Sequence, residues 1–194
     1  MIDHNEIREA ARSDGLVAAL LLLHLRHGGT PVYGPAGHAV LPASVAGDAA
    51  PLLTLDLYGE ALVAVRGDGT GGPASPEWVL GLAWLRLGLS EGLLDRCLAY
   101  LGARTAGESP LLVQQLVKGQ LADAVTEHLL IQGSLYGEPA GEALDDLHLQ
   151  ITLADRMLLR LLGGSGFRAD GPGQSAHVSE LLADAHTGTA EVRT

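Results

Sequence analysis

Four segments in the second half of the chain carry apolar residues with helical period, and only short connections separate them. They are residues 76–102, 110–134, 139–162 and 173–186. Ser75 and Pro76 are a start signal for the first segment, since serine is a favoured N-cap and proline suits the first helical turn. Ser109 and Pro110 repeat this signal at the second segment. Such helices bury their apolar faces against each other, so the sequence predicts an antiparallel four-helix bundle.

The first part of the chain has a different pattern. Residues 2–27 look helical, with a charged first half and an almost wholly apolar second half. Short β-type runs follow, PVYG, HAVLP, LLTLDLYG and EALVAVRG, and the loop GDGTGGPAS (67–75) ends them. We therefore divide this mainly α chain into an N-terminal helix (1–29), a small β segment (30–74) and the helical bundle (75–194).

Composition excludes several classes of partner and site. The formal net charge is −11, which argues against nucleic acid and against an anionic membrane surface. The apolar run 16–25 is too short to span a bilayer and lacks a signal-peptide pattern, so a cytoplasmic protein is expected. The single Cys97 permits no internal disulfide. His24 and His27 lie on one helix face without a further ligand at motif spacing, so no metal site is expected.

Three motifs occur in order along the bundle segment. They are Arg104 with Pro110-Leu111, Gln115 and Leu121-Ala122-Asp123; Gly163-Gly164-Ser165-Gly166-Phe167 with Pro172; and Thr187-Gly188-Thr189-Ala190-Glu191-Val192. Together they resemble the C-terminal half of the acyl-CoA dehydrogenase family, and the likeness covers residues 75–194. Residues 53–71 resemble the last strands of that family's middle β domain. The resemblance implies a C-terminal four-helix bundle and a history of FAD binding.

The resemblance also implies that redox chemistry has been lost. In the family, a glutamate removes the α-proton of an acyl thioester while the flavin takes a hydride from the β-carbon. Aligned without a gap, that glutamate falls on Thr187, whose hydroxyl is no general base near neutral pH without a second base. The alternative position of the family's base falls on Trp78. The neighbouring Glu77 points about 100° away on a helix, so it does not simply replace the base.

The flavin contacts that the resemblance implies are incomplete. Arg104, Gln115, Gly163, Gly164 and Thr189 remain as cofactor-binding candidates, for FAD or for a phosphopantetheine. Arg104 is either a phosphate anchor or a helix-terminal charge. The Gly-Gly turn either cradles phosphate oxygens or only ends a helix. No cofactor is expected, although FAD stays possible.

The remaining candidates surround the lost base. His186 stands where the family has an aromatic residue that lines the acyl pocket. It is either an acid or base that titrates near neutrality, or a histidine favoured by a helix C-terminus. Thr187 either hydrogen-bonds a substrate carbonyl or caps the helix. Trp78, Glu77 and Phe167 are candidate substrate contacts, and Trp78 is also a candidate core residue.

Three hypotheses follow from these residues. The first is a redox-inactive, cofactor-independent enzyme of bacterial biosynthesis, catalysing proton transfer, cyclisation, isomerisation or dehydration on an acyl or polyketide-like substrate through His186 and Thr187. The second is a non-catalytic partner subunit that lends Arg104 and Gln115 to a full-length acyl-CoA dehydrogenase. The third is a residual FAD-dependent dehydrogenase with another base, such as Glu77 or Glu191. All predict an oligomer, either of this chain alone or with a full-length dehydrogenase.

Overall fold

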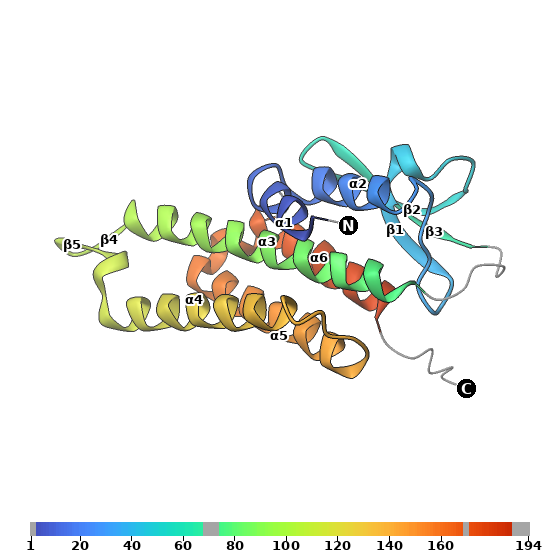
Figure 1. Ribbon diagram of the computed structural model, residues 1–194. Coiled ribbons are helices and arrows are strands. Elements are labelled where there is room, and N and C mark those ends of the chain that lie inside the picture. The colour runs from blue at the N-terminus through green and yellow to red at the C-terminus, as the bar shows by residue number, and fades with distance from the viewer. Residues whose placement is uncertain (1–2, 68–73, 169–170, 188–194) are drawn as a thin grey trace, which may run out of the picture.

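The computed structural model describes residues 3–67, 74–168 and 171–187. The second half forms an antiparallel four-helix bundle, so the predicted mainly α fold is confirmed (Figure 1). The bundle helices are α3 (Pro76–Gly102), α4 (Gln115–Leu135), α5 (Glu142–Leu162) and α6 (Pro172–His186). None of the helices in the described ranges combines the length and apolar character needed to cross a bilayer.

Helix α3 is the central element and contacts every other helix of the bundle. Its bounds match the prediction because its start signal works as expected: the Ser75 hydroxyl accepts a hydrogen bond from the Trp78 N–H at 3.2 Å. Leu82, Leu85 and Leu87 are fully buried along its length. A helix that is apolar on all sides is stable only when other elements surround it, and α3 is surrounded.

The predicted starts of two bundle helices are wrong. Ser109–Pro110 forms strand β5, which pairs with β4 (Thr105–Ala106), and the 3-10 turn η2 (Leu111–Val113) follows. The cause is a local hairpin, in which the Leu111 N–H donates to the Arg104 carbonyl at 2.7 Å. Helix α5 begins at Glu142 instead of residue 139, because the turn after α4 extends to Gly141.

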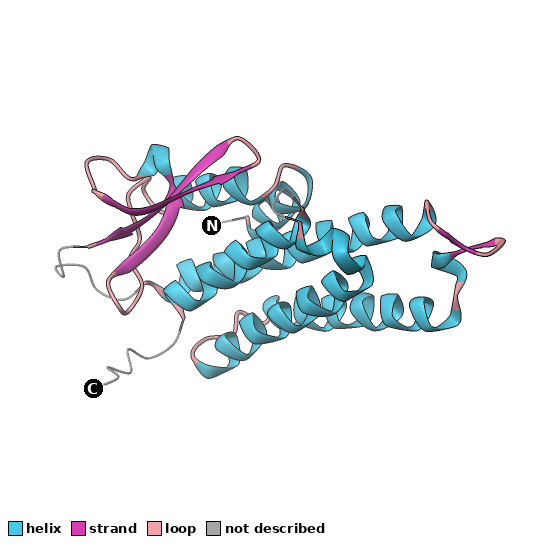
Figure 2. Ribbon diagram, turned by 180° about the vertical axis from the view of Figure 1, so that it is seen from behind, coloured by secondary structure: helices cyan, strands magenta, loops and turns pink. Residues whose placement is uncertain are grey.

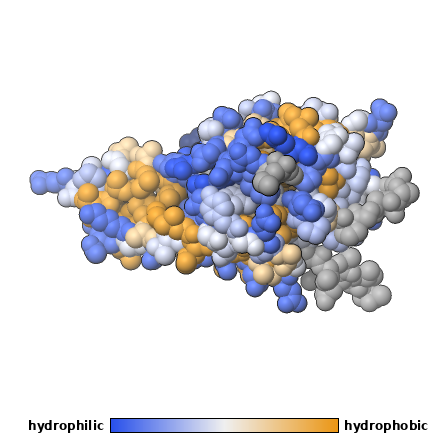
Figure 3. All heavy atoms as spheres, in the orientation of Figure 1, coloured by the Kyte–Doolittle hydropathy of each residue, from blue (hydrophilic) through white to orange (hydrophobic). Residues whose placement is uncertain are grey.

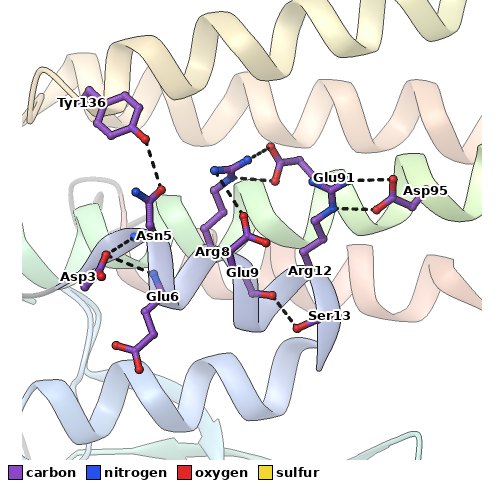
Figure 4. Close-up of polar contacts among 10 residues, drawn as sticks. All are labelled: Asp3, Asn5, Glu6, Arg8, Glu9, Arg12, Ser13, Glu91, Asp95 and Tyr136. Atoms are coloured by element: carbon purple, nitrogen blue, oxygen red, sulfur yellow. Dashed lines mark hydrogen bonds and ion pairs between the residues drawn. The ribbon is translucent and has the colours of Figure 1, made fainter.

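The predicted single N-terminal helix is also wrong, because the segment forms α1 (His4–Ser13) and α2 (Leu16–Arg26). The break falls at Gly15, whose φ of 94° lies in a region that side chains disfavour. Helix α1 lies along α3, and two bidentate ion pairs join them (Figure 4). Arg8 donates to Glu91 at 2.8 and 2.9 Å, and Arg12 donates to Asp95 at 2.8 and 3.0 Å.

The β segment is a three-stranded antiparallel sheet of order β1-β3-β2, beside α2 at one end of the bundle (Figure 2). The strands are β1 (His38–Pro42), β2 (Pro51–Leu57) and β3 (Glu60–Arg66), with the turn η1 (Ala43–Val45) after β1. The predicted PVYG strand is wrong, since residues 31–34 form a loop. Most of the predicted loop 67–75 lies outside the described residues.

A buried guanidinium joins three helices in the centre of the bundle. Arg86 of α3 is 0% exposed. Its Nε donates to Ser179 Oγ of α6 at 3.0 Å, and its terminal nitrogens donate to Thr152 Oγ1 at 2.7 Å and to the His148 carbonyl at 2.9 Å, both on α5. It also contacts His148 Nδ1 at 2.9 Å. No carboxylate of the described residues lies within ion-pair distance of Arg86.

These contacts fix the protonation of His148. Arginine only donates, so His148 Nδ1 accepts and the proton sits on Nε2, which donates to the Val79 carbonyl at 3.2 Å. Burial and the charge of Arg86 lower the pKa of His148 to about 3. Burial lowers the pKa of Arg86 to about 10, so the cation persists at neutral pH.

We expect Arg86→Met to lower the free energy of unfolding by about 3 kcal/mol or more, because it leaves buried acceptors on α5 and α6 without their donor. The matched control is Arg156→Met, which removes only an exposed pair with Glu180 and costs less than about 1 kcal/mol. Urea unfolding followed by circular dichroism measures both. An equal loss of unfolding free energy in the two variants would show that the buried Arg86 contributes no more to stability than the exposed Arg156.

Candidate functional site

The ends of three helices bring an indole and three imidazoles together. Trp78 lies in the first turn of α3, His24 and His27 lie at the end of α2, and His186 is the last residue of α6. From the Trp78 ring, the ring centroids lie at 4.6 Å for His24, 5.3 Å for His27 and 5.5 Å for His186. We call these four residues the histidine–tryptophan cluster. It unites Trp78, on which the alternative position of the family's base falls, with His186, which precedes the position of the lost glutamate.

Three of the four rings of the cluster lie inside the protein, and His27 is half-buried. Trp78 and His24 are fully buried, and His186 is 3% exposed. The loop at residues 31–34 packs against the end of α6, and Gly34 makes this approach possible: a Cβ at this position would lie 1.6 Å from the Ala185 carbonyl oxygen. This contact holds His186 against the loop that follows α2.

Five ring nitrogens of the cluster are buried without a hydrogen-bond partner among the described residues. They are Trp78 Nε1, His24 Nε2, His27 Nε2 and both nitrogens of His186. A buried polar atom left unpaired costs about 1–3 kcal/mol, so such atoms in native proteins are normally paired with protein, water or a ligand. Five such atoms are concentrated at one corner, where each is available to pair with water or with a ligand.

The imidazoles of the cluster are held neutral. Burial, together with the charge that His24 would carry when protonated, lowers the pKa of His186 to about 4. Burial also lowers the pKa of His24 to about 4 and that of His27 below its usual range. Neutral His24 donates from Nδ1 to the Thr30 carbonyl at 3.1 Å, so its Nε2 carries a lone pair. At neutral pH the cluster thus offers bases that need no prior deprotonation.

The other predicted substrate residues do not join the cluster. The Thr187 hydroxyl donates to the Ala183 carbonyl at 2.8 Å, which makes it a cap of α6. Glu77 lines a separate cavity of about 370 Å³ with His4 and Trp84. Phe167 is 70% exposed in the turn η3 (Gly163–Phe167), far along the bundle.

The predicted cofactor residues gather at the opposite end of α3. Arg104 lies 4.3 Å above the Tyr100 ring, and Ser165 of the Gly163-Gly164 turn donates to the Tyr100 hydroxyl at 3.1 Å. Trp78 and Gly102 are separated by about 36 Å along the helix. Thr189 lies outside the described residues. Within one chain, these residues therefore do not fit a flavin that would react beside His186.

Sequence reasoning missed a second polar group, centred on Asp155 of α5. Asp155 and Arg86 occupy positions of the helical pattern that face the core, which is the signal that could have identified them. Ser90 Oγ lies 2.9 Å from His128 Nε2, the geometry of a nucleophile and its base. Ser90 is fully buried, however, and Asp155 hydrogen-bonds Ser90 instead of the imidazole, so we assign a structural role to this pair.

No metal centre is apparent in the part of the chain that the structure describes, where no group of three His, Cys, Asp or Glu side chains is placed to hold an ion. This includes His24 and His27, whose rings both lie against the Trp78 indole.

Compared by sequence, the chain matches no protein-family model and no curated protein. Compared by structure, it is similar to solved acyl-CoA dehydrogenases. For butyryl-CoA dehydrogenase from Megasphaera elsdenii, the TM-score is 0.53 and the identity 17%, over 82% of this chain and 47% of that chain. For acyl-CoA dehydrogenase from Slackia heliotrinireducens, the TM-score is 0.53 and the identity 15%, over 81% and 47%.

A steroid ACAD variant, Tcur3481–Tcur3483, is similar with a TM-score of 0.50 and 22% identity, over 76% of this chain and 49% of that chain. At these identities the similarity is one of fold, and the fold is that of the acyl-CoA dehydrogenases. The chain spans about half the length of these solved structures.

The depressed histidine pKa values predict acid sensitivity. Native His186 stays neutral down to about pH 4, whereas its unfolded form binds a proton below about 6.5, so stability falls as pH drops across this window. His24, His128 and His148 act in the same direction. Asp155 has the opposite effect on stability. Burial raises its pKa to about 7, so the folded state binds a proton more tightly than the unfolded state, and stability falls as pH rises towards 7.

We expect His186→Phe to reduce the slope of unfolding free energy against pH by up to about 1.4 kcal/mol per unit between pH 6.5 and 4. Urea titrations across this range measure the slope. Thr187→Val, which changes the next residue without removing an imidazole, is the control. An unchanged slope in His186→Phe would mean that His186 is not buried as described.

Proposed function

Starting from the acyl-CoA dehydrogenase fold, we propose that this chain is a cofactor-independent enzyme that transfers a proton beside a carbonyl group. The substrate is an acyl or polyketide-like molecule, and the reaction class is isomerisation, cyclisation or dehydration in biosynthesis. The observation that carries the proposal is the histidine–tryptophan cluster, with its five unpaired buried ring nitrogens. They supply both donors and acceptors in a desolvated corner, which is what carbonyl chemistry requires.

Each residue of the cluster has a role in this proposal. Neutral His186 takes a proton from the carbon next to the carbonyl and becomes an imidazolium. The negative charge that develops on the carbonyl oxygen accepts a hydrogen bond from the Trp78 indole N–H. The imidazolium then returns the proton to another atom of the substrate, so atoms and charge balance without an oxidant. His24 Nε2 accepts a hydrogen bond from a substrate hydroxyl.

Thr187 has a supporting part in the proposal. Its hydroxyl and its backbone N–H both donate to the Ala183 carbonyl, at 2.8 and 2.7 Å, so neither is available to a substrate. We therefore assign Thr187 to positioning: it ends α6 and fixes the orientation of His186. The absence of a suitable base at positions 78 and 187 supports a reaction without hydride transfer.

The first test is solvent exchange of the α-protons of butyryl-CoA in deuterium oxide, followed by mass spectrometry. We expect wild-type protein to catalyse exchange without added flavin and His186→Gln to lower the rate at least about 100-fold, the lower range for general acid–base catalysis. His177→Gln, on the exposed side of the same helix, is the matched control and should retain the rate. Unchanged exchange in His186→Gln would remove His186 from the mechanism.

The pH dependence of this exchange follows from the neutral state of His186. Because burial lowers its pKa to about 4, the base remains competent as pH falls to about 5, and the rate declines as the ring protonates near pH 4. Initial exchange rates between pH 4 and 8 measure this profile. Stoichiometric binding of added FAD, with exchange that depends on it, would favour the residual dehydrogenase instead.

A second candidate function is that of a partner subunit, and the outer face of α4 favours it. Beyond its buried residues, α4 also exposes Leu116, Val125, Leu129 and Leu130, at 43% to 75%. Figure 3 shows apolar surface gathered over the C-terminal part of α3 and the beginning of α4. Exposed apolar patches commonly mark interaction sites. In this role the chain would pack its bundle against a full-length acyl-CoA dehydrogenase and bring Arg104 and Gln115 to that subunit's flavin.

Light scattering tests the role of this face. We expect the purified wild-type chain to form an oligomer and Leu129→Glu to dissociate it, because a charge buried at an apolar interface is destabilising. Lys118→Glu, on the same helix but at a polar position, is the control. If the wild-type chain is monomeric alone and forms a complex only with a full-length dehydrogenase, the partner-subunit function is favoured. If it is monomeric alone and also in the presence of the dehydrogenase, neither the homo-oligomer nor the hetero-oligomer exists.

A further inference from the structure

A cavity of about 600 Å³ opens between α5, η3 and α6, away from the histidine–tryptophan cluster. Its walls include Thr152, Asp155, Leu159, Phe167, Ala176 and Glu180. This volume lies within the range of small-molecule sites, about 300–1,000 Å³. The wall combines the apolar side chains of Leu159, Phe167 and Ala176 with several polar ones.

Asp155 is the most deeply buried polar residue in the wall of this cavity. It is 5% exposed, and its Oδ1 has no hydrogen-bond partner among the described residues. Asp155 also lines a second cavity of about 270 Å³ on the other side, beneath Tyr58 and Leu93. A buried carboxyl with an unused oxygen, placed between two cavities, is costly to the fold unless a molecule satisfies it.

The charges around the cavity restrict what that molecule can be. Arg156, paired with Glu180, and Arg168 line the same cavity, so a cation gains little there. An anion would meet Asp155 and Glu180. Burial raises the pKa of Asp155 to about 7, so both its protonation states are present near neutrality. A hydroxyl satisfies either state, because it donates to a carboxylate and accepts from a carboxylic acid.

We propose that this cavity is a second binding site, for a neutral, largely apolar, ring-containing molecule that carries a hydroxyl. The hydroxyl pairs with Asp155, and the apolar body lies against Leu159 and Ala176. Phe167 stands at the mouth, where its 70% exposure leaves its ring free to cover a bound molecule. The site is independent of the proton-transfer chemistry proposed for His186.

The test uses two fluorescent probes that differ only in the hydroxyl, 1-pyrenemethanol and 1-methylpyrene, in titrations of the purified chain. We expect one-to-one binding of both, with the alcohol bound about 3- to 10-fold more tightly, the effect of one hydrogen bond. Asp155→Leu should abolish this preference, because it replaces the carboxyl with a side chain that cannot hydrogen-bond. Phe167→Ala should weaken both probes, and His186→Gln should change neither.

The proposal is overturned if wild-type protein binds neither probe, binds both equally, or loses the preference in His186→Gln instead of Asp155→Leu. Because Asp155 is buried, its variant requires a check of folding by circular dichroism. If it does not fold, the wild-type preference together with the exposed Phe167→Ala variant decides: weakened binding of both probes supports the site, and unchanged binding overturns it.

Discussion

The arrangement of the bundle depends on a positive charge enclosed by neutral partners. Arg86 extends from α3, and its hydrogen bonds reach α5 through His148 and Thr152 and α6 through Ser179. A buried cation without a carboxylate partner tolerates little displacement, because each lost hydrogen bond leaves charge unsolvated. The hydrogen bonds of Arg86 therefore fix the positions of α3, α5 and α6 relative to one another. The bond to Ser179 also sets where the end of α6, with His186, lies.

The two ends of the bundle carry different parts of the resemblance to the acyl-CoA dehydrogenases. At one end, Trp78 and His186 occupy the positions that the resemblance assigns to the base and the acyl pocket, and imidazoles surround them. At the other end, Arg104 and the Gly163-Gly164 turn contact Tyr100 directly or through Ser165. Because the long helix α3 separates these ends, their residues cannot meet at one small molecule within one chain.

Local signals in the sequence predicted the helices of the bundle. Where the prediction failed, contacts between separate segments of the chain determined the structure. Helix α3 was predictable to its last residue, because its cap, its proline and its apolar pattern agree. The start of α4 was not, because a hairpin contact between Arg104 and Leu111 competes with the Ser-Pro signal. Likewise, His24 and His27 were visible as a pair on one helix face, but their meeting with His186 depends on chain segments far apart in sequence.

The contact between Gly34 and Ala185 joins residues that are 151 positions apart, from the first and the last parts of the described chain. Such a contact closes a long loop of chain, and this closure costs conformational entropy. During synthesis, the corner that holds His186 therefore remains open until α6 has left the ribosome. Both ring nitrogens of His186 stay hydrated until α6 packs against the loop at residues 31–34, so their desolvation accompanies that contact.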